Sequence, residues 1–192
     1  MSALIVGLDI SLNGTGFCRS DGASGVLHPP KFKGDYITGM PRLRWVLDSI
    51  WNVTEGAELV VIESFLFSAK GASFADLTGL GTLVRFTMWE NNRQYVDVNP
   101  GTLKVFATGS GAAKKPDMLA AAIKKLGWSG SNDDNVIDSR WLLEMALSHY
   151  EKRALTAKQC DAIAKVGWPA ISHSSTSSDV AKEEALTMEA AP

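Results

Sequence analysis

Apolar residues gather in two short runs that each end in an acid. Residues 4–8 are apolar or glycine and lead into Asp9, and residues 59–62 are apolar and lead into Glu63. Neither run alternates with polar residues, so each is typical of a central strand covered on both faces. A helical pattern over residues 41–51 separates them. Strands joined by such a crossover lie parallel, so we expect Asp9 and Glu63 to meet at one sheet edge.

The rest of the pattern predicts a hairpin, two further strands and several helices. Asn13 and Gly14 indicate a turn, after which residues 15–19 return as an antiparallel strand. Residues 25–28 and 36–37, separated by a Pro-Pro turn, are expected to form one further antiparallel strand with a ragged edge, and residues 94–99 another. Helices are expected over residues 41–51, 73–88 and 116–126, after the cap Asn99, from about Asp133, and from the capping box at Thr156 to Gly167. The prediction is an α/β fold with a mixed five-stranded sheet flanked by helices.

Composition indicates one domain followed by a tail. With 192 residues and 45% hydrophobic content, the chain is long enough for one well-filled core, which we assign to residues 1–169. Residues 170–192 are rich in Ser, Thr, Ala and Glu and poor in large apolar residues, which predicts a disordered acidic tail. No apolar run approaches the roughly 20 residues of a membrane span, so we expect a cytoplasmic protein, in the host cytoplasm if a phage encodes it.

The formal net charge of −2 hides an uneven distribution. From residue 173 onward there are four acids and one lysine, and the preceding chain has 18 basic and 17 acidic residues. Residues 104–125 hold five lysines and one acid, Asp117. This segment predicts a basic face that suits nucleic acid. The alternative is an ordinary solvated helix surface, which explains Lys124 and Lys125 better than the lysines of the preceding loop.

Two further acids are predicted to lie beside the sheet edge. Asp134 and Asp138 are four residues apart, so both project from one face of a helix, where like charges destabilise it unless a cation or the helix amino terminus compensates. Four converging carboxylates raise each other's pKa and favour Mg²⁺ or Mn²⁺ over zinc. Two such ions about 3.5 to 4 Å apart promote phosphodiester cleavage. The alternative is that Asp9 and Asp134 only cap their elements and Asp138 faces water.

Four motifs in order resemble those of the RuvC family of Holliday junction resolvases, within the RNase H-like nucleases. The resemblance covers roughly residues 3–150. The motifs are Gly7-Leu-Asp9-Ile-Ser-Leu-Asn-Gly-Thr-Gly16-Phe, Val61-Ile-Glu63, Asn99-Pro100 with Lys104 and the segment from Thr108 to Lys115, and Asp134-Asn-Val-Ile-Asp138-Ser in a phage-type form.

The resemblance implies an RNase H-like fold and a homodimer that binds a four-way junction and nicks two opposing strands. It implies Asp9, Glu63, Asp134 and Asp138 as ligands of two Mg²⁺ ions, with Mn²⁺ as an alternative, and Lys115 as a further catalytic residue. The residues expected to contact DNA are Lys104, Lys114, Lys115, Phe65, Phe67 and Lys70.

Departures from the family pattern leave alternatives open. The last two acids are four residues apart here and three apart in the bacterial pattern, so Asp133 or Asn135 are alternatives to Asp134. Leu66 stands where an aromatic residue is expected, so either flanking phenylalanine can stack on DNA, or both pack in the core or dimer interface. Two other functions fit part of the pattern: a branched-DNA binding protein without catalysis, and an actin-like nucleotide-binding protein, which would need a second comparable domain.

Overall fold

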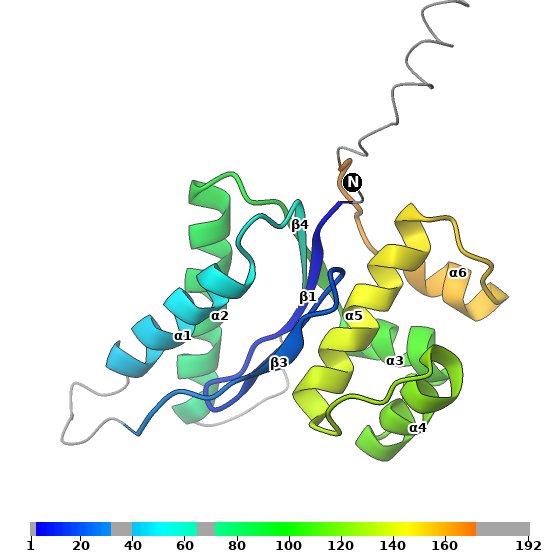
Figure 1. Ribbon diagram of the computed structural model, residues 1–192, viewed down its shortest axis with the longest axis horizontal. Helices are drawn as coiled ribbons and strands as arrows, with labels where there is room; N and C mark the ends of the chain where they lie inside the picture. Colours follow the sequence, from blue (N-terminus) through cyan, green and yellow to red (C-terminus); the bar gives the residue numbers. More distant parts are fainter. Residues whose placement is uncertain (1–2, 32–39, 65–71, 172–192) are drawn as a thin grey trace, which may run out of the picture.

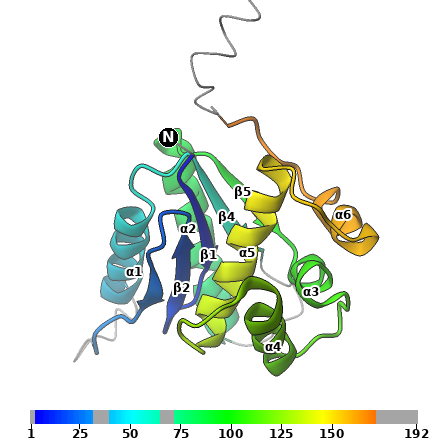
Figure 2. The same cartoon turned by 45° about the vertical axis from the view of Figure 1, so that its right-hand side comes forward.

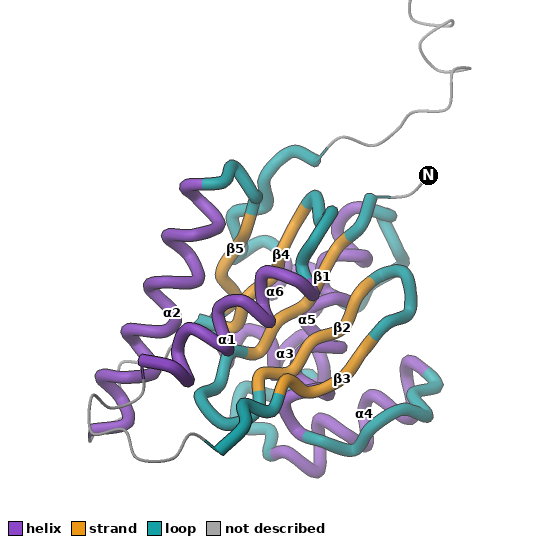
Figure 3. The backbone as a smooth tube through the Cα atoms, turned by 60° about the vertical axis from the view of Figure 1, so that its left-hand side comes forward, coloured by secondary structure: helices purple, strands orange, loops and turns teal. Residues whose placement is uncertain are grey.

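In the described part of the chain, five strands form one mixed sheet with helices on both faces (Figure 1). The structure is a computed structural model that describes residues 3–31, 40–64 and 72–171. The strands are β1 (Ile5–Asp9), β2 (Thr15–Arg19), β3 (Ser24–Leu27), β4 (Leu59–Glu63) and β5 (Tyr95–Val98). Their order is β3-β2-β1-β4-β5, as Figure 3 shows. β1 pairs antiparallel with β2 and parallel with β4, which confirms the predicted hairpin and crossover.

Two helical layers cover the sheet. The helices are α1 (Met40–Val53), α2 (Ala72–Glu90), α3 (Pro100–Thr108), α4 (Lys115–Leu126), α5 (Asp134–Tyr150) and α6 (Ala157–Ile163). α1 and α2 lie on one face, and α5 lies on the other with α3, α4 and α6 outside it (Figures 1 and 2). The predicted caps are present at Asn99 and Thr156. The predicted end of α6 is wrong: the helix stops at Ile163 and the chain continues in turns before Gly167.

Alternation along the strands decides which side each acid faces. Ile5, Leu59 and Val61 belong to the core beneath α5, whereas Leu8 and Ile62 belong to the core beneath α1 and α2. Successive side chains of a strand point to opposite faces. Asp9 and Glu63 continue the odd-numbered series of their strands, so both project toward α5.

The backbone of α5 lies unusually close to the sheet at two glycines. A Cβ atom on Gly7 would lie 2.1 Å from the Ser139 carbonyl oxygen, and one on Gly16 would lie 2.1 Å from the Asn135 carbonyl oxygen. No side chain fits at those distances, so glycine in β1 and β2 is what allows this contact. The close approach sets the height of α5 above the strand ends that carry the acids.

Several expectations fall on residues outside the described ranges: the expected strand residues 36–37, the side chains of Phe65, Phe67 and Lys70, and the tail from residue 172.

Cys18 is a buried free thiol and Cys160 an exposed one. None of the helices in the described residues combines the length and the apolar character that a bilayer-spanning segment requires.

Candidate metal centre

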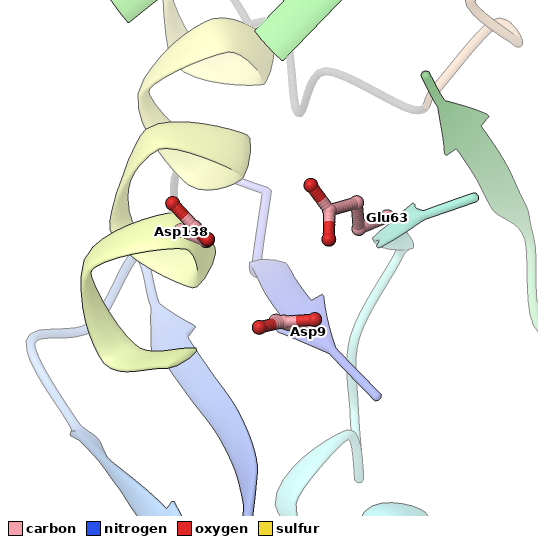
Figure 4. Close-up of side chains that lie close together, drawn as sticks. All are labelled: Asp9, Glu63 and Asp138. Carbon is pink, nitrogen blue, oxygen red and sulfur yellow. The ribbon is translucent and has the colours of Figure 1, made fainter. Parts of the chain in front are cut away.

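Three carboxylates converge where β1 and β4 end. Asp9 closes β1, Glu63 closes β4, and Asp138 reaches them from the second turn of α5 (Figure 4). One oxygen from each side chain lies within 4.8 Å of the other two. All three residues are half-buried. The parallel pairing of β1 with β4 and the position of α5 therefore bring together residues that are up to 129 positions apart in sequence.

Backbone and hydroxyl hydrogen bonds fix the position of α5 relative to Asp9. The Asp9 N–H donates to the Ser139 hydroxyl over 3.2 Å, and that hydroxyl donates to the Asn135 carbonyl over 2.6 Å. The Asn135 side-chain amide donates to the Gly14 carbonyl over 2.5 Å. On the other strand, the Ser64 N–H donates to the Val98 carbonyl over 2.8 Å and extends the pairing past Glu63. The three carboxylates thus stand on backbone that is held on both sides.

Burial and mutual repulsion raise the pKa of all three acids. Burial raises the pKa of Asp9 well above its usual value, and repulsion from Glu63 and then Asp138 adds to this. Burial, followed by repulsion from Asp138, raises the pKa of Glu63 to about 7. Burial, followed by repulsion from Asp134, raises the pKa of Asp138 to about 6. A group of carboxylates in this state is stabilised by a cation.

Two lysines of the predicted basic segment stand beside the carboxylates. The positive charge of Lys104, on α3, lowers the pKa of Glu63 and Asp138, and that of Lys115 lowers the pKa of Asp9 and Asp138. Lys115 begins α4, and its ammonium donates to the Asp134 carboxylate over 2.8 Å. The lysines offset part of the negative charge while remaining outside the group of three acids.

The remaining predicted site residues occupy different positions. Asp134 pairs with Lys115 and is not one of the three clustered acids. Asp133 caps α5, because its carboxylate accepts the Asn135 N–H over 2.9 Å. Lys114 is exposed immediately before α4, where its N–H donates to Asp117 over 2.8 Å.

Sequence reasoning missed the contribution of Ser139, whose hydroxyl links Asp9 to α5. A signal was available in Gly7 and Gly16, since a glycine inside a strand indicates close approach of another backbone. That signal predicts a contact but does not identify which helix makes it.

The three acids fit a hard divalent cation. Carboxylate oxygens are the ligands that Mg²⁺ and Mn²⁺ prefer, and the described residues place no histidine or cysteine in the group. The raised pKa values of Asp9, Glu63 and Asp138 fit the same conclusion, because a bound cation would relieve the repulsion that contributes to them.

Comparison with solved structures places the fold. The structure of Thermus thermophilus RuvC matches with a TM-score of 0.58 at 16% sequence identity, covering 79% of this chain and 98% of that one. The chain has the RuvC fold. T. thermophilus RuvC in complex with a Holliday junction substrate matches with a TM-score of 0.58 at 18% identity, covering 80% and 98% of the two chains. Ydc2, the yeast mitochondrial Holliday junction resolvase, matches with a TM-score of 0.50 at 11% identity, covering 79% and 82%.

The likeness to RuvC is one of structure. No protein-family model matches the sequence, and no curated protein is similar to it in sequence. The RuvC fold confirms the predicted RNase H-like mixed sheet flanked by helices. At these sequence identities the comparison establishes the fold. The chemistry of the site is inferred from the residues of this chain.

The raised pKa values predict how stability depends on pH without divalent metal. Unfolded carboxyl groups titrate near pH 4, whereas Glu63 and Asp138 titrate in the folded protein at about 7 and about 6. The folded state therefore binds more protons between these values, and the contribution of the group to the free energy of unfolding falls as pH rises through them. Asp138→Asn removes one charge, so in EDTA we expect it to be more stable than wild type near pH 8, with a smaller difference near pH 5.

Urea unfolding at both pH values measures this difference. Asp161→Asn, an exposed position on α6, is the matched control and should follow wild type at both. An Asp138→Asn variant that is less stable than wild type near pH 8 would show that the carboxylates do not repel each other in the folded protein.

Proposed function

We propose that this protein is a metal-dependent endonuclease that cleaves branched DNA, with the four-way junction as its substrate. The observation that carries the proposal is the convergence of Asp9, Glu63 and Asp138 at one edge of a RuvC fold. One of the structures that share this fold is a complex with a Holliday junction. These half-buried acids oppose folding at neutral pH, so their convergence supports a functional use.

In this proposal the three acids hold Mg²⁺ or Mn²⁺. Asp9 ends the central strand β1, with Glu63 on the parallel neighbour β4 and Asp138 on α5 within reach of it. When bound, two ions would supply activation of a water and stabilisation of the leaving oxygen in phosphodiester hydrolysis. The protein's own contribution is to fix the carboxylates on rigid strand ends and to place lysines beside them.

Lys104 and Lys115 are the residues we propose to hold the phosphates around the scissile bond. Each stands close enough to the acids to lower the pKa of two of them. Lys114 is exposed immediately before α4 and next to Lys115 in sequence, so we propose that it contacts a neighbouring phosphate of the DNA. The acids repel a phosphate, so these ammonium groups offset that repulsion and orient the backbone at the same time.

We also propose that the active form is a homodimer joined through the outer face of α2. Leu83, Phe86 and Trp89 are 42%, 51% and 69% exposed, and they recur every three residues along the helix. The opposite face, with Leu80, Val84 and Met88, is already buried against the sheet, so α2 is apolar on both sides. Nicking two opposing DNA strands needs two active sites. A second copy of the chain, bound through the same three apolar residues of its own α2, supplies the second site by twofold symmetry.

The first prediction of this function concerns catalysis. Asp9→Asn should lower the rate of nicking of a synthetic four-way junction in Mg²⁺ by about 100-fold or more, because even residues that only orient metal ligands contribute about 10- to 100-fold. Junction binding should be retained, since we assign the phosphate contacts to lysines and not to Asp9. Nicking assays and binding by fluorescence anisotropy measure the two effects, with Asp161→Asn as control. Tight binding by wild type with no product in Mg²⁺ or Mn²⁺ would instead support a non-catalytic junction-binding protein.

The second prediction concerns assembly. Phe86→Glu should convert the dimer to a monomer and uncouple the two nicks, because a carboxylate cannot be buried against an apolar partner without a large desolvation penalty. The matched control is Ile123→Glu, since Ile123 on α4 is equally exposed at 52% but lies outside the stripe. Sedimentation velocity measures the oligomeric state, and nicking of a cruciform plasmid measures coupling. A dimeric Phe86→Glu protein would rule out this interface.

A further inference from the structure

The pair formed by Lys115 and Asp134 points to a role for Asp134 that its sequence position does not suggest. We propose that Asp134 is a positioning residue that holds Lys115 at the rim of the carboxylate group and does not bind metal. This inference rests on the proposed function, because it assigns Lys115 to the scissile phosphate. It replaces the expectation that four acids share the metal.

The Asp134 side chain lies against Lys115 and outside the group of three acids. Its Oδ2 atom accepts a hydrogen bond from the Lys115 ammonium over 2.8 Å, and the Asp134 side chain is 43% exposed. The three acids whose oxygens lie within 4.8 Å of one another are Asp9, Glu63 and Asp138. Asp134 lies one helical turn before Asp138, so its charge reaches that group, raising the pKa of Asp138, while its oxygens do not join it.

The pair of Lys115 and Asp134 lies where two helices begin. Lys115 is the first residue of α4 and Asp134 the first of α5, so one ion pair links the starts of two helices beside the acids. The positive end of the α5 dipole favours a carboxylate in the first turn of the helix, which is where Asp134 lies. Asp133 already serves as the cap, so Asp134 is not needed for that purpose.

Lys115 depends on Asp134 for its position. Its ammonium is attracted by Asp134 first, and more weakly by Asp138 and Asp9. Its side chain is 70% exposed and long, so nothing else in the described contacts restrains it. If Asp134 lost its charge, the ammonium would be drawn to the clustered acids, where it would compete with a divalent cation and leave the phosphate unsupported.

The two possible roles of Asp134 are separated by removing Lys115 first. In the Lys115→Ala background there is no ammonium to position, so the further change Asp134→Asn should alter metal affinity by less than about fivefold, the size of one exposed charge interaction. Asp138→Asn in that same background should lower metal affinity by more than about tenfold. Thermal-shift titrations with Mn²⁺ and with Mg²⁺, without DNA, measure both affinities. A loss on Asp134→Asn that equals the loss on Asp138→Asn would make Asp134 a ligand and overturn the proposal.

The kinetic part of the experiment tests positioning directly. With Lys115 present, Asp134→Asn should lower kcat on the four-way junction by about 10- to 100-fold with little change in KM, as expected when a group that acts on the reacting phosphate is displaced. With Lys115→Ala, the same change should have no further effect, since the two residues act as a unit. Asp134→Glu should restore most of kcat, because it keeps the charge.

The outcomes also separate this proposal from the proposed function. If wild type binds metal but nicks no junction, the nuclease proposal fails, and the metal titration in the Lys115→Ala background still decides whether Asp134 is a ligand. If Asp134→Asn changes neither kcat nor metal affinity in wild-type background, the positioning role is overturned while the nuclease proposal stands. If no variant responds to metal, both are overturned.

Discussion

The close packing of α5 against the sheet is the constraint on which the site depends. Gly7 and Gly16 let the helix backbone approach to a distance at which no side chain fits. Asp138 can meet Asp9 and Glu63 because the helix lies that near, and the Ser139 hydroxyl ties the helix to the Asp9 backbone. A helix carried at an ordinary distance by larger residues would leave two acids at the sheet edge and a third out of reach.

The close packing of α5 brings three carboxylates together although their mutual repulsion opposes folding. Burial and repulsion raise the pKa of each of the three acids, and two lysines from separate helices offset only part of the charge. Sites whose titration is displaced in this way are more common at functional centres than elsewhere. Apolar cores lie on both sides of the sheet, and the excess negative charge is confined to the edge that carries the acids.

Much of this arrangement could be predicted from sequence, and the limits have physical causes. Two buried runs ending in acids, separated by a helical pattern, predict parallel strands, and parallel strands bring Asp9 and Glu63 together. Caps such as Asn99 and Thr156 are local, so they are readable from a few residues. The fate of Asp134 is different. Its spacing from Asp138 predicts a shared helix face, but its choice of partner depends on Lys115, whose position is set by tertiary packing.

Three acids converge at one edge of a RuvC fold, and the proposed function requires that they bind a divalent cation. The most direct measurement is anomalous X-ray scattering from crystals grown with Mn²⁺. It should show a peak in contact with oxygens of Asp9, Glu63 and Asp138. The absence of a peak between these three side chains at saturating Mn²⁺, whether or not Mn²⁺ is bound elsewhere, would contradict the claim.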